Sequence, residues 1–237
     1  MVMLKKFINE AEVFAVNENL ELEVRVIGPG KSKVVVIDNF YKNPMMVRDL
    51  AISIPPSVNE RIASNLPVGP DSGRINAFYL FDHFGDVFED VFRRALPEVY
   101  KKMPPAYFQK SFLNATFLCN VMTSDNLPPR VPHCDNPYPD FYAGLIYLNT
   151  DDECAGGTSF YTFGGKHYGN VDTMDVEGKI LMDHYVTDSE ADWEMLDLVE
   201  MKFNRFVLYP QLQYHTAYIK PGMFVNGNYR INQVFFI

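Results

Sequence analysis

Short apolar runs separated by turn residues fill the second half of this chain, and they restrict its fold more than any other feature. The runs are rich in β-branched and aromatic residues, as strands are. They cover residues 111–121, the segment around His133, and residues 140–149, 156–163, 204–209 and 229–237. Short strands in this arrangement predict a β-barrel or a sandwich over residues 108–237.

Two further strands are expected near the start of the chain. Apolar and acidic residues alternate over residues 20–26, which predicts a half-exposed strand. Residues 33–40 are β-branched and apolar, which predicts a buried strand. The Gly-Pro-Gly sequence at 28–30 predicts the turn between them.

Helices are expected between these strands and the β-rich half. Asn43 and Pro44 are typical of a helix start, and a proline pair at 55–56 should end that helix. Residues 56–73 contain several prolines and glycines and predict a loop. From Gly85 to Tyr100 aromatic and aliphatic residues recur at helical spacing, which predicts a helix packed on a sheet.

The composition limits the class of protein. A chain of 237 residues with 47% apolar residues can bury a large core, and its length fits one domain. The net charge of -9 argues against a nucleic-acid partner, because phosphate binding needs a basic surface. We expect no membrane segment and no signal peptide. An odd number of cysteines without a CxxC pair favours the reducing cytoplasm; they are Cys119, Cys134 and Cys154.

The residues with the clearest chemistry are His133 and Asp135. In a strand, side chains two residues apart point to one face, so Cys134 between them would turn away. One imidazole and one carboxylate held in this way can occupy adjacent positions on a metal ion. His215 is the best candidate for a second imidazole from a distant part of the chain. Two histidines and one carboxylate leave half of an octahedral ion open, the pattern of non-haem Fe(II) oxygenases.

Several segments around these residues follow the order of a known family. They are His-Cys-Asp-Asn-Pro at 133–137, Gly-Leu-Ile-Tyr-Leu-Asn at 144–149, Gly-Gly-Thr-Ser-Phe at 156–160, Arg-Phe-Val-Leu-Tyr at 205–209 leading to His215, and the strand beginning at Arg230. In these segments the chain resembles the Fe(II)- and 2-oxoglutarate-dependent dioxygenase superfamily, in particular its prolyl-hydroxylase-like branch. The opening Val-Ile-Asp-Asn-Phe at 36–40 is also similar to the family's N-terminal part.

The resemblance implies a mainly β (α+β) fold. Its core would be a double-stranded β-helix, or jelly-roll, with N-terminal helices packed outside. On this basis residues 1–237 form a single domain. Residues 1–107 would supply N-terminal strands and supporting helices, and residues 108–237 the catalytic jelly-roll core.

The resemblance also implies roles for individual residues. His133, Asp135 and His215 would be the catalytic ligands of Fe(II), with 2-oxoglutarate and O2 as co-substrates and ascorbate as an optional reductant. Arg230 would bind the distal carboxylate of 2-oxoglutarate, and Tyr147 would share that role. Arg230 lies farther after His215 than the family usually shows, which an extended hairpin would absorb. Lys220 is the alternative carboxylate ligand.

The function expected from this resemblance is hydroxylation of a small molecule, an amino acid or a peptide side chain. The alternative is a cupin-type metal-binding jelly-roll protein that acts as a sensor or binding module without oxygenase turnover. Succinate production from 2-oxoglutarate would discriminate between the two. We expect no nucleic-acid or membrane partner, and a homodimer stays open.

Other candidates have a structural alternative beside the functional one. Trp193 fits a packing anchor as well as a substrate platform, and Asn149 fits backbone pairing as well as ligand orientation. His83 favours a surface or capping position, and His167 and His184 lie in an acidic segment, residues 164–200. That segment should interrupt the strand pattern, and part of it, with the 56–73 loop, should form the wall of the substrate entrance. An acidic wall would favour a cationic or neutral substrate.

Overall fold

A computed structural model describes most of the chain. It covers residues 8–53, 73–79, 81–104, 107–108, 114–122, 130–135, 140–166 and 183–237, with backbone alone for 73–79, 81–83 and 114–122. The helices are α1 (Glu10–Val13), α2 (Pro44–Ser53), α4 (Phe81–Ala95) and α5 (Pro97–Tyr100). The strands are β1 (Leu22–Ile27), β2 (Ser32–Ile37), β3 (Gly73–Tyr79), β4 (Asn114–Met122), β5 (Tyr142–Tyr147), β6 (Gly157–Phe163), β7 (Trp193–Glu200), β8 (Phe206–Pro210), β9 (His215–Tyr218) and β10 (Arg230–Phe236).

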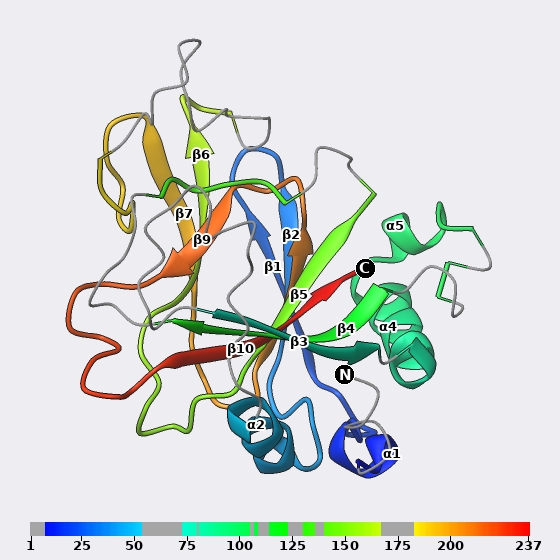
Figure 1. Cartoon of the computed structure of the whole chain (residues 1–237). Helices are drawn as coiled ribbons and strands as arrows, with labels where there is room; N and C mark the ends of the chain where they lie inside the picture. The colour runs from blue at the N-terminus through cyan, green and yellow to red at the C-terminus, as the bar shows by residue number, and fades with distance from the viewer. Residues whose placement is uncertain are drawn as a thin grey trace.

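The strands form two sheets (Figure 1). The large sheet has the order β1-β2-β8-β5-β10-β4-β3, and the small sheet has the order β7-β6-β9. Neighbouring strands within both sheets pair antiparallel. The predicted mainly β fold with a few helices is therefore confirmed at this level.

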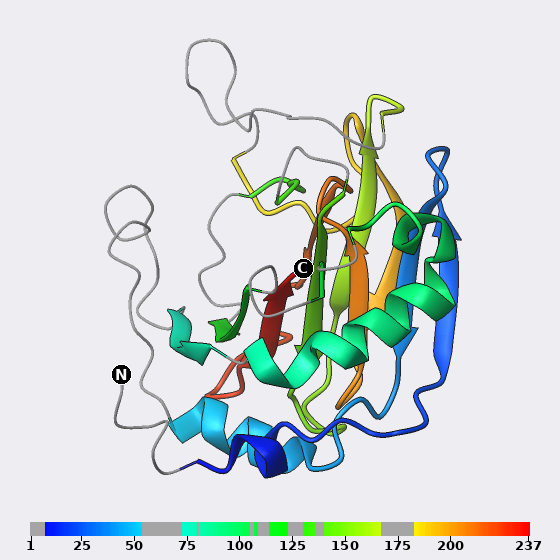
Figure 2. The same cartoon turned by 90° about the vertical axis from the view of Figure 1, so that its right-hand side faces the viewer.

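Helix α4 covers one face of the large sheet, as Figure 2 shows. Its buried phenylalanines recur at helical spacing, so they all lie on one side of the helix. Phe84 packs on Phe235 of β10, and Phe88 packs on Phe206 of β8 and on Phe235, with ring centroids 5.2–5.8 Å apart across the interface. This aromatic contact is the main core of the protein, which we call the outer core.

The opposite face of the large sheet packs on the small sheet. Side chains alternate along each strand, so the residues between those of the outer core point this way. Together with Phe160 of β6 and Val199 of β7 they form a second apolar layer, which we call the inter-sheet layer; its large-sheet members include Val34, Val36, Leu145, Tyr147, Val207 and Tyr209. The two sheets therefore enclose a space into which alternate residues of β5, β8 and β10 project.

Several expected elements differ from the structure. Helix α4 begins at Phe81 and not at Gly85, and β3 occupies residues that carry no clear strand pattern in the sequence. β3 lies at the edge of the large sheet, where pairing with β4 supplies the hydrogen bonds that local propensity does not predict. Leu96 separates α4 from α5, because Pro97 cannot continue the first helix.

The acidic segment also differs from its expectation. Residues 193–200 were expected within a non-strand excursion, but they form β7, which pairs with β6 along its length. The pairing has a register shift between Phe160 and Tyr161, and Leu196 of β7 lies against the β1–β2 turn, where a Cβ at Gly28 would be 2.5 Å from its side chain. Residues 167–182, and with them His167, lie outside the described residues, as does most of the 56–73 loop.

The link between β9 and β10 is not a hairpin. β9 pairs with β6 in the small sheet, whereas β10 pairs with β4 and β5 in the large sheet. The long spacing between His215 and Arg230 therefore serves a crossing from one sheet to the other. Turns at Gly222 and Gly227, both with positive φ, carry the chain along this path.

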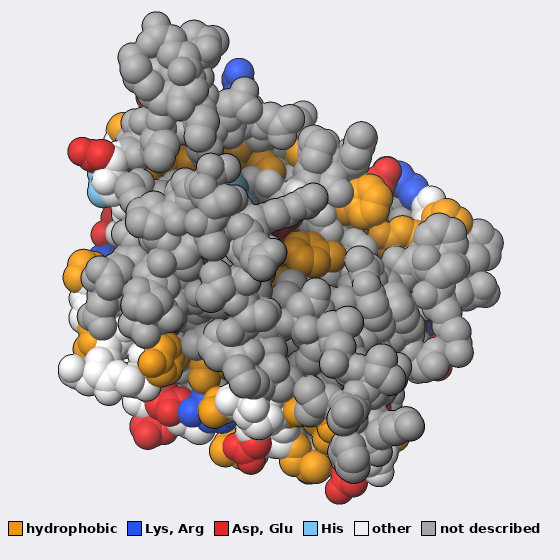
Figure 3. Space-filling model, in the orientation of Figure 1, with side chains coloured by type: hydrophobic (Ala, Val, Ile, Leu, Met, Phe, Trp, Pro, Cys, Tyr) orange, Lys and Arg blue, Asp and Glu red, His pale blue; other side chains and the backbone are white. Residues whose placement is uncertain are grey.

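Within the described residues, no helix combines the length and apolar character that a membrane crossing requires. Charged side chains of both signs lie next to one another along the lower edge of the face in Figure 3. The excess negative charge is therefore not gathered into one area along that edge.

Candidate functional site

The candidate site forms where the segment around His133 joins the free edge of β9. His133 N–H donates to His215 O at 2.9 Å, and His215 N–H donates to His133 O at 3.0 Å. The next donor of this ladder, the Asp135 N–H, turns to Gln211 O instead, so the segment makes a single bridge and is not the regular strand expected from the sequence. Asp135 lies beyond the bridge and its N–H donates to Gln211 O at 2.9 Å.

The three predicted ligands converge. Asp135 places one carboxylate oxygen 3.3 Å from His133 Nε2 and the other 3.4 Å from His215 Nε2. One ligand atom from each residue lies within 4.8 Å of the other two. Ligand atoms about 2.0–2.2 Å from one ion stand about 3 Å apart at right angles, so this group fits a first-row metal after small side-chain adjustments.

The protonation of the three side chains also fits a metal. His215 Nδ1 lies 2.9 Å from Gln213 O and donates to it, which leaves the Nε2 lone pair toward Asp135. Burial, with the positive charges of Arg130 and His215, lowers the pKa of His133 to about 4. Burial alone would raise the pKa of Asp135, but His215 and His133 bring it well below its usual range. An ionised Asp135 carboxylate beside a neutral His133 imidazole is a state that can bind a cation.

Cys134 turns away from this group, as the sequence predicts. Its Sγ donates to Leu212 O at 2.8 Å, and its side chain packs on an apolar cluster on the outside of the small sheet. Trp193 is buried in the same cluster, between Tyr161 and Tyr214. Trp193 is therefore a packing residue on the face opposite the inter-sheet layer.

Arg230 lies at the start of β10 and is 3% exposed. Its guanidinium stands over the Tyr147 ring at 5.5 Å, donates to Asn232 Oδ1, and lies 3.4 Å from Gly157 O. Its Nε has no hydrogen-bond partner, and no carboxylate of the described residues forms an ion pair with it. A buried cation without a counter-ion is costly, so this position fits an anionic ligand.

Asn149 holds the backbone on both sides of Arg230. Its Nδ2 donates to Tyr229 O, and its Oδ1 accepts the Ile231 N–H at 2.7 Å. Of the two interpretations of Asn149, the structure therefore favours backbone pairing, and through it the residue positions Arg230.

Tyr147 lies beside Arg230, and its share in binding 2-oxoglutarate stays a prediction. Its hydroxyl lies 2.7 Å from Thr158 Oγ1 and donates to Val199 O at 3.3 Å, and the Arg230 guanidinium lies 5.5 Å from the centre of its ring. Burial raises the pKa of Tyr147, and Arg230 and Thr158 lower it in part. The hydroxyl would have to turn from Thr158 to share a ligand of Arg230.

The remaining predicted candidates do not join the site. Lys220 Nζ pairs with Asp188 at 2.8 Å, and the lysine side chain is 40% exposed. His184 is also at the surface, where it pairs with Asp183 and Glu190. The side chain of His83 lies outside the described part.

Two residues near the metal ligands carry no distinct signal in the sequence. The Tyr209 ring lies 4.6 Å from that of His215 and 5.2 Å from that of Phe160, within the inter-sheet layer. Burial and the Asp135 charge raise the pKa of Tyr209 well above its ordinary value, so its hydroxyl stays protonated. Arg130 contacts His133 directly. A basic residue shortly before the ligand pair is its only sequence signal.

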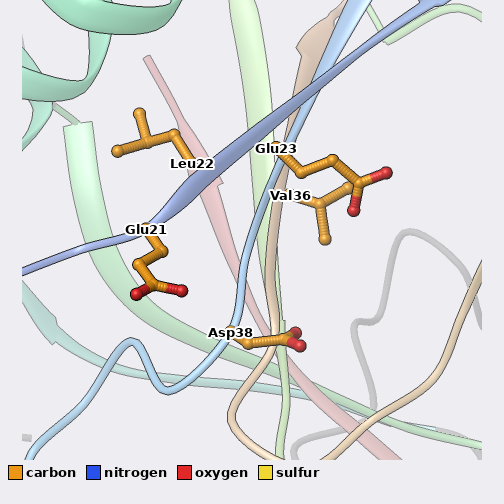
Figure 4. Close-up of a pocket in the computed structure, with 5 residues that line it drawn as sticks. All are labelled: Glu21, Leu22, Glu23, Val36 and Asp38. Atoms are coloured by element: carbon orange, nitrogen blue, oxygen red, sulfur yellow. The ribbon is translucent and has the colours of Figure 1, made fainter.

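A separate shallow hollow of about 280 Å³ lies beside β1 and β2 (Figure 4). It is lined by Glu21, Leu22, Glu23, Val36 and Asp38. None of the predicted site residues lines it, and Asp38 is already paired with Arg205 and Lys202. This hollow is therefore not the candidate site.

Comparisons with known proteins give distant structural likenesses and one family. An oxidoreductase of the 2OG-Fe(II) oxygenase family from Burkholderia pseudomallei is 13% identical, with a TM-score of 0.39; the alignment covers 86% of this chain and 83% of that one. An N-substituted L-amino acid dioxygenase from Burkholderia ambifaria is 10% identical, with a TM-score of 0.38 and coverage of 86% and 80%. No curated protein matches the chain. A family model matches residues 18–230, nearly the whole length, and the chain therefore belongs to DUF6445, a family of unknown function.

Proposed function

We propose that this protein is an Fe(II)- and 2-oxoglutarate-dependent dioxygenase that hydroxylates a small molecule, an amino acid or a peptide side chain. The observation that carries the proposal is the convergence of His133, Asp135 and His215 in a protein that also buries Arg230, which forms no ion pair with the described residues. A two-histidine, one-carboxylate site leaves coordination positions open. A buried guanidinium offers a planar match to a carboxylate. A chelating oxo acid with a second carboxylate requires both: open positions on the metal for the oxo acid group and a guanidinium for the second carboxylate.

The strand order supports a double-stranded β-helix as the core. In the large sheet β4, β10, β5 and β8 are neighbours, and in the small sheet β7, β6 and β9 are followed by the His133 segment. From β4 to β10 the chain therefore alternates between the two sheets, except that β6 and β7 follow one another and pair within the small sheet. This alternation is expected of a jelly-roll, in which each half-turn crosses from one sheet to the other.

Each residue would have a defined task in this reaction. His133, Asp135 and His215 would hold Fe(II), and Arg230 would bind the distal carboxylate of 2-oxoglutarate, with Asn149 holding Arg230 in place. Iron, 2-oxoglutarate and dioxygen together would supply the oxidation of a C–H bond, with 2-oxoglutarate converted to succinate and CO2. The apolar inter-sheet layer would keep water away from the ion pair between the Arg230 guanidinium and the 2-oxoglutarate carboxylate.

The test is stoichiometric binding followed by turnover. Under anaerobic conditions, addition of Fe(II) and 2-oxoglutarate should produce the visible charge-transfer absorption of a chelated oxo acid. Admission of oxygen should then yield succinate, measured by mass spectrometry, even without the primary substrate. Metal binding without 2-oxoglutarate binding or succinate would instead support a cupin-type sensor or binding module.

A further inference from the structure

Arg130 lies at the candidate metal site in a constrained position. Three residues before His133, it donates its backbone N–H to His184 O at 3.1 Å and accepts the Val186 N–H at 2.9 Å. Val131 next to it packs in the apolar cluster outside the small sheet. The Arg130 side chain takes the other direction and places Nη2 3.0 Å from Nε2 and 3.4 Å from Nδ1 of His133.

This guanidinium has no counter-ion in the described part of the chain. Asp135 faces the two imidazoles, and the acids near the backbone partners of Arg130, Asp183 and Glu190, both pair with His184. Arg130 is half-buried, so its charge is only partly screened by water. A cation in this environment is available for an anionic group that arrives from outside.

Metal binding would make the Arg130 guanidinium still more accessible to an anion. A metal ion on His133 Nε2 would take the lone pair that Arg130 now faces, and the guanidinium would lose its only described side-chain acceptor. The metal and Arg130 would then be like charges side by side. Such a pair repels unless an anion lies between or beside the two charges.

The proposed co-substrate does not supply an anionic group for Arg130. On the proposed function, a divalent ion, Asp135, dianionic 2-oxoglutarate and Arg230 balance one another. None of the described acids compensates the charge of Arg130. An anionic group of another molecule that approaches the open side of the metal would do so.

We propose that Arg130 is a specificity-determining residue that binds a carboxylate of the primary substrate, so that the substrate class is carboxylate-bearing small molecules. This inference rests on the proposed function and differs from the cationic or neutral substrate that the acidic segment favours. A guanidinium binds a carboxylate through two parallel hydrogen bonds, which also orients the bound molecule. Because the anchor lies beside a metal ligand, the oxidised carbon would be close to the anchored carboxylate.

The experiment uses full-length protein loaded with Mn(II), which replaces Fe(II) without turnover, and saturated with 2-oxoglutarate. Small carboxylic acids and their matched primary amides are screened by ligand-observed NMR. Wild-type protein should bind a subset of the acids in preference to their amides. Arg130→Gln should weaken binding of those acids about 10- to 100-fold, and Arg130→Lys should weaken it less.

Two controls separate the possible outcomes. Arg25→Gln removes a guanidinium that already pairs with Glu23 and Asp197 and should leave acid binding unchanged. The affinity for 2-oxoglutarate, measured by calorimetry, should stay within about twofold in Arg130→Gln, and circular dichroism should show the wild-type fold. If Arg130→Gln does not fold, Arg130→Lys, which keeps the charge but not the planar pair of donors, carries the test.

Equal binding of acids and amides by the wild type would overturn the proposal, as would an acid preference that both Arg130 variants retain. A large loss of 2-oxoglutarate affinity in Arg130→Gln would assign Arg130 to the co-substrate instead. Failure of wild-type protein to bind Mn(II) and 2-oxoglutarate at all would contradict the proposed function. An acid preference that depends on Arg130 would survive that result, because it can be measured on the metal-free chain.

Discussion

Asp135 is the residue on which the candidate metal centre depends most. Its two oxygens face the two imidazoles, and it is the only carboxylate among the described residues in the ligand group. Without it, two neutral imidazoles would have to hold a divalent ion alone. His215 is further restrained by its hydrogen bond to Gln213 O, whereas Asp135 is restrained through its backbone.

Replacement of Asp135 by Ala should therefore weaken binding of Fe(II) or Mn(II) by at least about 100-fold, more than loss of an outer hydrogen-bond partner does. Calorimetric titration with Mn(II) measures the change. The melting temperature of the metal-free variant should stay close to that of the wild type. Asp140→Ala, which removes an exposed acid nearby in the sequence, is the matched control. Unchanged Mn(II) affinity in Asp135→Ala would contradict the assignment of this residue as a ligand.

A single substitution also tests whether Arg230 binds 2-oxoglutarate. Arg230→Ala should raise the dissociation constant of 2-oxoglutarate about 30- to 1000-fold, or about 2–4 kcal/mol, because a charge-assisted bidentate contact is lost. Calorimetry on Mn(II)-loaded protein measures this, and the Mn(II) affinity should be unchanged. Lys220→Ala should have no effect, since Lys220 pairs with Asp188 at the surface. If Lys220→Ala instead weakens 2-oxoglutarate binding and Arg230→Ala does not, Lys220 and not Arg230 binds the distal carboxylate.

At the scale of elements, the contact between α4 and the large sheet supports the wall of the site from behind. β8 and β10 present Phe206 and Phe235 to α4, and they present Tyr209 and Arg230 to the opposite side. The positions of the site residues therefore depend on strands whose other face is packed by the helix. The two faces can be tested separately, because the outer core and the inter-sheet layer share no side chains.

Phe88→Ala should lower the free energy of unfolding by about 3–5 kcal/mol, as large-to-small changes in a core do. Phe88 is fully buried and contacts three other phenylalanine rings. Denaturant unfolding monitored by fluorescence measures the loss. Asp86→Ala, on the exposed side of α4, should change stability by less than about 0.5 kcal/mol. The folded Phe88→Ala variant should keep its Mn(II) affinity. If its free energy of unfolding falls by less than about 1 kcal/mol, α4 is not a main support of the sheet.

At the scale of the whole molecule, acid stability should depend on a link between distant parts of the chain. Asp38, just after β2, accepts hydrogen bonds from Arg205 at 2.6 and 3.1 Å and from Lys202 at 2.8 Å, just before β8. Arg205, with Lys202, lowers the pKa of Asp38 from 3.8 to about 2 despite partial burial. Because the folded-state pKa is lower than the unfolded one, the link stabilises the protein above pH 4 and this contribution disappears as the pH falls toward 2.

Asp38→Asn should therefore lower the free energy of unfolding at pH 7 by about 0.5–1 kcal/mol, a modest value because the pair is partly exposed to solvent. The difference from the wild type should shrink as the pH falls from 4 to 2. Denaturant unfolding across this pH range measures both quantities. Glu18→Gln, which removes an exposed partner of Lys42, should show a smaller difference at every pH. A difference that is independent of pH would contradict the assignment to the Asp38 charge.

Much of the molecule can be predicted from local sequence patterns. Apolar runs rich in β-branched and aromatic residues predict β2, β5, β6, β8 and β10, because this composition is a property of each run alone. The spacing of His133 and Asp135, with a distant histidine, likewise predicts a ligand group that the structure brings together. The roles of these residues in metal binding stay predictions.

The structure decided what depends on partners distant in the sequence. β3 and β7 have weak patterns of their own and form because β4 and β6 pair with them. Lys220 and Arg230 are both cations close together in the sequence, yet the crossing between the sheets leaves Lys220 at the surface and buries Arg230. Arg130 reaches His133 because its backbone is held by residues 184–186, a contact that no local pattern encodes. The sequence by itself thus determined which residues can bind a metal, and the packing of the two sheets decided which cations lie near them without an ion pair to any described residue.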